Sequence, residues 1–232
     1  RMLTRTEQRV TKCDRQIRMV SQLAKWMCPA ICNPMDQETV RTYDSGARGF
    51  AEEWEEEQAA PADLQAVVRQ YFRPGPTIDV GCGSGRDTAW LSANGFDVVG
   101  IDASKGLIEE AQRRHPGINF IMGRLPELEA LQSGAYQNVL CETVIMHLGA
   151  EGAAASARRL AELLMPGGVL YLSWRVTEGE DIRDPKGRLY AAFDTSLITG
   201  AIDGLDIELD ERIVSASSQK VVHRLVARRP AG

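Results

Sequence analysis

The chain has few of the features that stabilise secreted or membrane proteins. Its five cysteines are an odd number with no C-x-x-C pair, and this usage favours a reduced, cytoplasmic protein over a disulfide-bonded secreted one. No apolar run approaches the roughly 18 residues that a membrane-spanning helix needs. Aromatic residues make up only 6% of the 232 residues, but hydrophobic residues reach 44%, which is enough for a sizeable core. The composition predicts a soluble globular protein with no membrane partner.

Clustered positive charge is missing from most of the chain. Residues 1–34 hold seven of the 27 Lys and Arg residues but only two of the 32 Asp and Glu residues, so the remainder carries 20 basic and 30 acidic side chains. No stripe of Lys and Arg with interleaved aromatic residues follows residue 34. Because phosphate backbones require clustered positive charge, we expect no nucleic-acid partner and favour a small molecule as ligand.

Residues 1–34 form a basic N-terminal extension whose function the sequence does not reveal. Apolar residues at helical spacing predict an amphipathic helix that ends near Pro29. We interpret the segment as a peripheral extension, flexible or translated ahead of a natural start at Met35. A targeting peptide, or a helix that packs over the active site or a neighbouring subunit, is the alternative. Cys28 and Cys32 lie one helical turn apart without a nearby His or further Cys, so no metal site is expected.

The most informative segment is an apolar run, 77–80, followed by Gly81, Gly83 and Gly85. Glycines at alternate positions let the backbone turn sharply out of a strand and approach a ligand, because no Cβ is present. The next helix then directs its N-terminus at that ligand. A second apolar run ends at Asp102, 17 positions after Gly85, where a carboxylate can accept hydrogen bonds from both ribose hydroxyls. The pattern predicts a β-α-β unit that binds a nucleoside cofactor.

The glycine spacing and later motifs carry a family resemblance. The pattern is G-x-G-x-G, whereas a dinucleotide fingerprint would place its third glycine at Arg86. The run 79–85 resembles the first motif of the class I S-adenosylmethionine-dependent methyltransferases, of the type that acts on small molecules. Residues 136–141 are similar to the family's fourth strand, and residues 163–173 to its helix, Pro-Gly-Gly turn and fifth strand. The resemblance begins near Glu38 and implies S-adenosylmethionine as cofactor and S-adenosylhomocysteine as product.

Strands and helices alternate from residue 37 onward, which implies right-handed crossovers and a parallel sheet. The expected strands are Thr77–Val80, Phe96–Ile101, Ile118–Ile121, Asn138–Cys141, Val169–Ser173, Leu205–Ser215 and Lys220–Ala227. The expected helices are Gln37–Ala60, Pro61–Tyr71, Thr88–Ala93, Leu107–Arg114 and Ala153–Leu164. The resemblance implies an α/β fold: a three-layer α-β-α sandwich with a seven-stranded, mostly parallel Rossmann-like sheet and an antiparallel last strand.

The chain is expected to divide into the extension, 1–34, and a single methyltransferase domain, 35–232. Within that domain we expect N-terminal capping helices at 35–73 and the cofactor-binding core at 74–175. Residues 176–232 would supply the acceptor-side loop and the C-terminal hairpin.

The resemblance places the cofactor contacts in the loops after the strands. Gly81, Gly83 and Gly85 would border the methionine part, Asp79 would orient the loop or meet the cofactor's amino group, and Asp102 would hold the ribose. The alternatives are a tight turn of a phosphate-binding fold and, for Asp102, a solvated strand-end carboxylate. The remaining predicted cofactor-binding residues are Cys82, Ala103, Arg124, Leu125 and Cys141.

The loop after the third strand departs from the family pattern. Many relatives place an acidic residue there to accept a hydrogen bond from the adenine amino group, but Arg124 has no acceptor in its side chain. The backbone of Arg124 and Leu125 could still bind adenine, or Arg124 could stack on it. An ordinary solvated arginine is the equal alternative.

Methyl transfer requires little chemistry from the protein, because the sulfonium is already an activated donor and a general base is needed only when the acceptor loses a proton. His147 is a candidate base or a histidine bonded to backbone. Glu142 could attract the sulfonium or an amine acceptor, or contact only cofactor or solvent. Tyr43 resembles the tyrosine by which many relatives close an N-terminal helix over the cofactor; the alternative is a packed aromatic residue. The segment after the fourth strand lacks the Asn/Asp-Pro-Pro-aromatic signature of amino-group methylation on DNA bases.

A charged loop, 177–188, follows the fifth strand, and such loops often form lids or acceptor pockets. Arg175 and Arg188 are the predicted substrate-binding residues. Together with Arg183 they would suit an anionic acceptor such as a carboxylate, although each could also be a solvated arginine.

The sequence predicts a cytoplasmic methyltransferase that transfers a methyl group from S-adenosylmethionine to oxygen, nitrogen or sulfur of a small molecule. One alternative is a protein or RNA acceptor docked by residues 1–34. Another is a cofactor-binding sensor or scaffold without turnover. The sequence does not indicate the oligomeric state or the acceptor.

Overall fold

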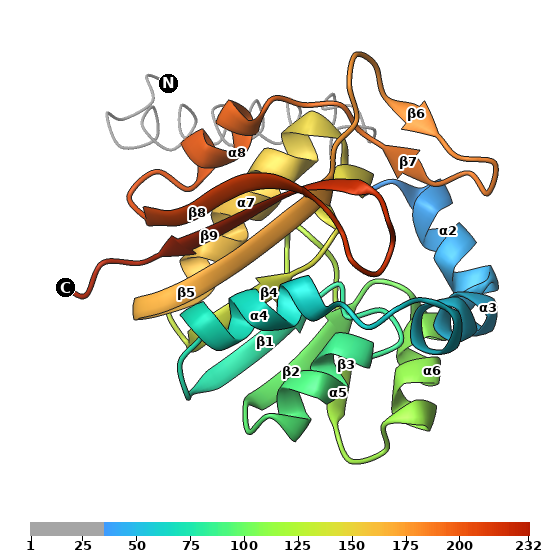
Figure 1. Cartoon of the computed structure of the whole chain (residues 1–232), viewed down its shortest axis with the longest axis horizontal. Coiled ribbons are helices and arrows are strands. Elements are labelled where there is room, and N and C mark those ends of the chain that lie inside the picture. The colour runs from blue at the N-terminus through green and yellow to red at the C-terminus, as the bar shows by residue number, and fades with distance from the viewer. Residues whose placement is uncertain (1–34) are drawn as a thin grey trace, which may run out of the picture. The chain divides into compact units, whose positions relative to one another are not determined.

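The apolar runs of the sequence form the strands of a central sheet. The structure, a computed structural model, describes residues 35–232, and the predicted helix and cysteine pair of the N-terminal extension lie outside them. Seven strands pair in the order β3-β2-β1-β4-β5-β9-β8 (Figure 1). Their bounds are β1 Pro76–Val80, β2 Asp97–Asp102, β3 Asn119–Met122, β4 Tyr136–Cys141, β5 Leu164–Arg175, β8 Asp206–Val214 and β9 Val221–Arg228. Strands β1 to β5 pair in parallel, and β9 runs antiparallel to both of its neighbours. The predicted sheet is confirmed.

Helices cover both faces of this sheet. Their bounds are α2 Gln37–Ser45, α3 Ala47–Glu52, the π-helix η2 Glu53–Glu57, α4 Ala62–Tyr71, α5 Arg86–Ala93, α6 Lys105–Arg114, the 3-10 turn η3 Ile145–His147, α7 Gly149–Leu163 and α8 Thr195–Ala201. Helices α4 and α7 lie on opposite faces of the sheet (Figure 1). Side chains of α7 and α8 belong to one core, and those of α4 and α5 belong to the other. The predicted three-layer sandwich is therefore present in the described residues.

The central strands are apolar throughout because both of their faces are buried. In β4, Val139 and Cys141 pack in the core beside α7, while Leu140 between them packs in the core beside α4 and α5. All three are at most 1% exposed. Such strands run parallel and end at one edge of the sheet, so the loops that follow them meet there.

The single helix expected over residues 37–60 is broken into three segments. Gly46 separates α2 from α3, and a Cβ at this position would lie 3.0 Å from the Phe50 ring. A π-helical turn then continues from α3, and such turns are frequent at functional sites. After the break, Trp54 of η2 lines the cavity described below, and Phe50 of α3 packs against Tyr43 and Trp54.

Three further segments differ from the prediction. The charged loop after β5 contains a two-stranded sheet, β6 Ile182–Arg183 paired with β7 Leu189–Tyr190, and α8 was not expected. The Pro-Gly-Gly segment lies inside β5 instead of forming a turn before it, and the β4–β5 register shifts opposite this segment. Within the described part of the chain, none of the helices has both the length and the apolar character of a membrane span.

Candidate active site

A cavity of about 310 Å³ opens where the strand ends meet. The loops after β1, β2 and β4 and the last residue of β5 form its floor. Residues of α2 and η2, the strand β7 and the turn between β8 and β9 form its cover. The cavity thus combines the predicted cofactor loops with segments from both ends of the described chain.

The glycine loop after β1 is shaped by contacts that exclude side chains. Gly81 has a φ of +76°, and a Cβ there would lie 2.2 Å from a methyl group of Val144. Gly83 has a φ of +56°, and its Cβ would lie 2.9 Å from the Trp54 ring. Both values lie in the left-handed region that favours glycine. Only glycine fits this backbone at positions 81 and 83, so the loop presents no side chains there to a ligand.

The Asp102 carboxylate is held by backbone groups on both of its oxygens. Its Oδ2 accepts a hydrogen bond from the Gly83 N–H at 3.0 Å, and its Oδ1 accepts one from the Ser104 N–H at 2.8 Å. Burial raises the pKa of this carboxyl. Each carboxylate oxygen has a second lone pair, so Asp102 can still accept hydrogen bonds from two ligand hydroxyls.

Two further carboxyl groups in the cavity wall have raised pKa values. Burial, aided by the charge of Asp87, raises the pKa of Asp79 to about 7, although the Thr88 hydroxyl donates to it at 2.6 Å. Burial likewise raises the pKa of Glu142 to about 7, and the Ser173 hydroxyl donates to its Oε2. Both groups would be stabilised as carboxylates by a cation in the cavity.

His147 links Tyr43 to the β7 strand. Its Nδ1 faces the Leu189 carbonyl, which can only accept a hydrogen bond, so this nitrogen carries the proton. Its Nε2 lies 3.0 Å from the Tyr43 hydroxyl. Because burial lowers the pKa of His147 to about 4, the ring is neutral at physiological pH and Nε2 accepts the Tyr43 proton in a hydrogen bond. Burial also raises the pKa of Tyr43, which keeps the phenol neutral.

Comparison with known proteins identifies the kind of domain that contains this cavity. Residues 78–168 match a family model described as a methyltransferase domain. A trans-aconitate 2-methyltransferase of Methylobacterium nodulans is 32% identical over 58% of this chain and 50% of its own. A ubiquinone biosynthesis O-methyltransferase of Rickettsia typhi is 35% identical over 41% of this chain and 39% of its own. The chain therefore spans about half, or less, of these two relatives.

Solved structures share the fold over a larger part of the chain. The 1,6-didemethyltoxoflavin-N1-methyltransferase of Burkholderia thailandensis, solved with S-adenosylhomocysteine, covers 82% of this chain and 88% of its own at 22% identity and a TM-score of 0.63. The magnesium protoporphyrin IX methyltransferase of Synechocystis, solved with S-adenosylmethionine, covers 84% and 98% at 21% identity and a TM-score of 0.65. Residues 78–168 are a methyltransferase domain, and the chain has the Rossmann-like fold of S-adenosylmethionine-dependent methyltransferases.

The part of the cover that lies over the glycine loop of this methyltransferase domain is aromatic. The rings of Tyr43 and Phe50 are 5.0 Å apart, and those of Phe50 and Trp54 stack at 5.5 Å. The Arg188 guanidinium lies 5.1 Å from the Phe50 ring and 5.8 Å from the Tyr190 ring. These stacked groups join the N-terminal helices to the β6–β7 hairpin across the cavity.

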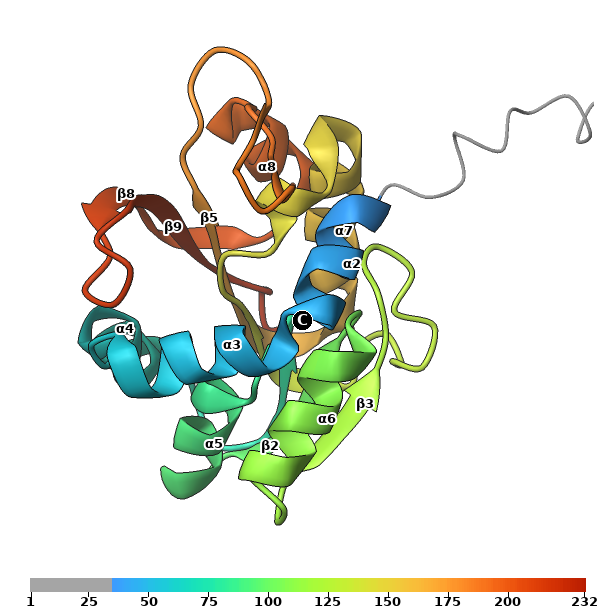
Figure 2. The ribbon, with the colours of Figure 1, turned by 90° about the vertical axis from the view of Figure 1, so that its right-hand side faces the viewer.

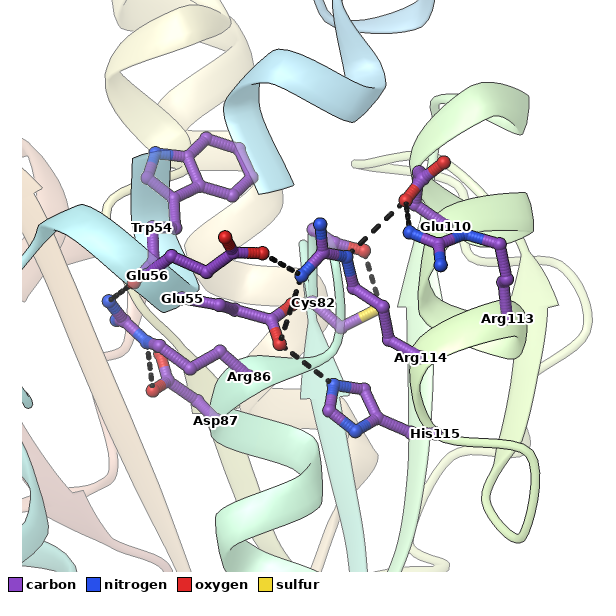
Figure 3. A network of polar contacts seen from close by, with 11 residues as sticks. Trp54, Glu55, Glu56, Cys82, Arg86, Asp87, Glu110, Arg113, Arg114 and His115 are labelled. Carbon is purple, nitrogen blue, oxygen red and sulfur yellow. Dashed lines mark hydrogen bonds and ion pairs between the residues drawn. The ribbon is translucent and has the colours of Figure 1, made fainter. Parts of the chain in front are cut away.

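Charged side chains fasten this cover of the methyltransferase domain to α6, beside which α2 and α3 lie in Figure 2. Arg114 of α6 pairs with Glu56 of η2 at 3.1 Å and with Glu110 of its own helix at 3.3 Å (Figure 3). His115 lies 3.4 Å from Glu55 (Figure 3). Farther along the cover, Asp44 of α2 accepts a hydrogen bond from the N–H of Gly106 in α6 at 2.7 Å.

Most of the residues predicted from the sequence line the cavity of the methyltransferase domain. They are Tyr43, Asp79, Gly81, Cys82, Gly83, Asp102, Ala103, Leu125, Glu142, His147, Arg175 and Arg188. Their individual roles stay predictions.

Three predicted cofactor contacts are not in the cavity wall. Gly85 lies under the loop, where a Cβ would be 2.7 Å from the Phe120 ring, so it is a glycine for packing reasons. Cys141 is fully buried in the core beside α7. Arg124 is exposed to solvent, and Leu125 after it turns into the cavity instead. These three residues therefore do not line the cavity, and their contacts with a cofactor stay predictions.

Other lining residues were missed by the sequence analysis of this methyltransferase domain. Trp54 stands in a run of glutamates, and Tyr190 follows the charged loop. Ser217, Ser218 and Lys220 belong to the β8–β9 turn, more than 130 residues from the glycine loop in the sequence. No local motif marks any of them. Among residues 35–232, no group of three or more His, Cys, Asp or Glu side chains is placed to hold a metal ion.

Proposed function

We propose that the protein transfers the methyl group of S-adenosylmethionine to an oxygen, nitrogen or sulfur atom of a small molecule and releases S-adenosylhomocysteine. The observation that carries this proposal is a single cavity with two unlike ends. On one part of its lining the glycine loop is hydrogen-bonded to Asp102, and on another part Tyr43, His147 and Tyr190 contact one another. A donor and an acceptor could therefore meet within one space that the cover shields from water.

The cofactor end fits S-adenosylmethionine in shape and in charge. Gly81 and Gly83 leave the loop without side chains, and Asp102 keeps two lone pairs for the ribose hydroxyls. Asp79 and Glu142 have raised pKa values, so their negative charge is poorly compensated in the protein alone. The cofactor carries a sulfonium and an ammonium group, and these cations would stabilise both carboxylates. Asp79 would face the amino group of the methionine part.

The bound cofactor supplies an activated methyl group, so the protein's contribution is mainly alignment. His147 holds the Tyr43 hydroxyl in place, but with a pKa near 4 it is a poor match for removing a proton from an alcohol or amine at neutral pH. Glu142, with a pKa of about 7, is the better matched base. We therefore assign proton acceptance to Glu142 and positioning to His147 and Tyr43.

We also propose that the protein works in the cytoplasm. Cys82 and Cys141 are free, buried thiols, which supports a reducing compartment such as the cytoplasm. A small-molecule acceptor is supported by the size of the cavity, about 310 Å³. Removal of residues 1–34 should then leave transfer to small molecules intact.

Calorimetric titration of the full chain with S-adenosylhomocysteine is the first experiment, because the product binds without turnover. We expect binding in the micromolar range, followed by methyl transfer when the protein receives S-adenosylmethionine and a panel of small acceptors. A folded protein that does not bind the product contradicts the proposed function. Binding without transfer to any acceptor would instead indicate a sensor or scaffold.

A further inference from the structure

The two ends of the cavity differ in charge. Asp79 of β1 and Asp102 at the end of β2 line the cofactor end, and Glu142, which follows β4, lies between the two ends. Arg175 and Arg188 line the opposite end, and Lys220 reaches it from the β8–β9 turn. The cofactor is a cation in the proposed function, so the acidic end suits it. The basic end suits a ligand of a different charge.

Two of the arginines near this end already have partners. Arg188 pairs with Asp184 at 2.6 Å and donates to the Tyr43 hydroxyl at 3.4 Å. Arg183 does not line the cavity, because it forms a two-pronged pair with Asp36 at 2.6 and 2.9 Å and so fastens the β6–β7 hairpin to α2. The sequence grouped both of them with Arg175, but the structure uses them to hold the cover in place.

Arg175 is different from these two arginines. Among the described residues, no carboxylate lies within 4.0 Å of its guanidinium nitrogens and no hydrogen bond of its side chain is found. Its guanidinium stacks on the Tyr190 ring, 4.7 Å from the ring centre, and Tyr190 in turn packs edge-on against His147 at 5.1 Å. Stacking fixes the plane of a guanidinium while its N–H donors stay available, and a fixed fork of donors matches a carboxylate.

Lys220 adds a second positive charge at the same end. Within residues 35–232 it has no acidic partner. Arg188 is matched by Asp184, so Arg175 and Lys220 are the cations of the acceptor end that have no acidic partner in the described part of the chain. A cationic acceptor would be repelled there, and a neutral acceptor would leave the Arg175 donors without a charged partner.

We infer that the methyl acceptor is an acidic small molecule whose carboxylate pairs with Arg175. This inference rests on the proposed function and names the substrate class of the same site. Arg175 ends β5, and Glu142 follows the neighbouring strand β4, so the anchored carboxylate lies one strand away from the group assigned to proton transfer. The carboxylate orients the acceptor through Arg175. Its reacting atom then lies between Glu142 and the cofactor end.

The test uses the full chain saturated with S-adenosylhomocysteine or S-adenosylmethionine. Aliphatic tricarboxylates, benzoates and hydroxybenzoates are titrated calorimetrically into the product complex, each beside its carboxamide. The same compounds are offered as acceptors with the cofactor. We expect acids to bind and to be methylated, and their carboxamides to bind at least tenfold more weakly.

Variants of Arg175 assign the effect to one side chain. Arg175→Gln should raise KM for the acids, or their Kd in the product complex, at least tenfold, and Arg175→Lys should recover part of the loss because it keeps the charge without the fork. Arg212→Gln is the matched control, because Arg212 pairs with the exposed Glu178 outside this cavity. Affinity for S-adenosylhomocysteine should stay within twofold in all three variants.

The outcomes separate this inference from the proposed function. Loss of product binding in the wild type contradicts the proposed function itself. With product binding intact, three results overturn the inference alone: no acid in the panel binds, carboxamides bind as well as acids, or Arg175→Gln leaves KM and Kd unchanged.

Discussion

The two ends of the cavity are built by different kinds of contact. At the cofactor end, backbone groups bond over short sequence distances, as in the Gly83 N–H to Asp102, 19 residues apart. At the acceptor end, side chains bond over long sequence distances: Tyr43 to His147 over 104 residues and Arg183 to Asp36 over 147. Backbone geometry therefore specifies the cofactor end, whereas the acceptor end depends on side chains that can change without altering the sheet.

The largest expected effect comes from breaking the backbone geometry of the cofactor end. Gly81→Ala forces a Cβ against Val144 at a positive φ, and we expect the affinity for S-adenosylhomocysteine to fall by roughly a hundredfold or more. Calorimetry measures this loss. Gly95→Ala is the control, because Gly95 also has a positive φ, +88°, but no atom within 4 Å of its Cβ position. Equal losses in both variants would show that strain alone, and not the loop's fit, sets the affinity.

A second substitution tests Asp102, the carboxylate at the cofactor end. Asp102→Ala removes the carboxylate bonded to Gly83 and Ser104, and we expect binding of S-adenosylhomocysteine to weaken by about 1 to 3 kcal/mol, the cost of leaving polar groups unpaired. Asp97→Ala, at the exposed opposite end of β2, should leave the affinity unchanged. If Asp102→Ala binds like the wild type, the ribose assignment is wrong.

The pH dependence of methyl transfer tests the role of Glu142, which lies between the two ends of the cavity. Glu142 must be ionised to accept a proton, and its pKa is raised to about 7, so kcat/KM for the acceptor should rise with pH toward a plateau above pH 7. The bound cofactor cation would move this rise to lower pH. Glu142→Gln should abolish the rise and reduce the plateau by roughly a hundredfold.

Glu151→Gln, at an exposed position in the first turn of α7, serves as the control for this profile. His147 should not contribute to the profile between pH 5 and 8, because its pKa is near 4. A flat wild-type profile would remove Glu142 from proton transfer.

The smallest expected effect concerns the fastening of the cover. Arg114→Gln removes the ion pair with Glu56, and we expect S-adenosylhomocysteine to dissociate about two- to fivefold faster, since partly exposed ion pairs contribute little. Stopped-flow displacement measures the rate. Arg113→Gln is the control, because Arg113 pairs with Glu110 on its own helix and not with η2. Identical rates in the two variants would mean that the cover is held by packing of its aromatic residues.

The part of the site nearest the sheet could be predicted because its determinants are local. The Gly81–Gly85 pattern and Asp102 sit at the ends of two apolar runs, so strand pairing alone brings them together. The same pattern did not separate Gly83, which faces the cavity, from Gly85, which makes room for Phe120. Both need a missing Cβ, and only the neighbouring side chains distinguish the two reasons.

The cover could not be predicted in the same way. The periodicity of residues 37–60 favoured one helix, but the position of Gly46 against Phe50 and the π-helical turn divide it. Polarity suggested a plain loop after β5, yet Arg183 and Thr42 bond to partners more than 140 residues away and order a hairpin there. Contacts at such separations leave no periodic signal in either segment.

The sequence by itself determined the alternation of strands and helices and the position of the glycine loop and Asp102 at the ends of two strands, because apolar periodicity and glycine spacing act over a few residues. Only the tertiary structure decided which charges remain for the acceptor. Arg175, Arg183 and Arg188 look alike in the sequence, but distant carboxylates pair with two of them and leave Arg175 stacked on Tyr190 without an acidic partner among the described residues. Whether a charged side chain has a partner depends on residues that are close in space but distant in the sequence. A local sequence pattern therefore does not show which charges stay available for a ligand.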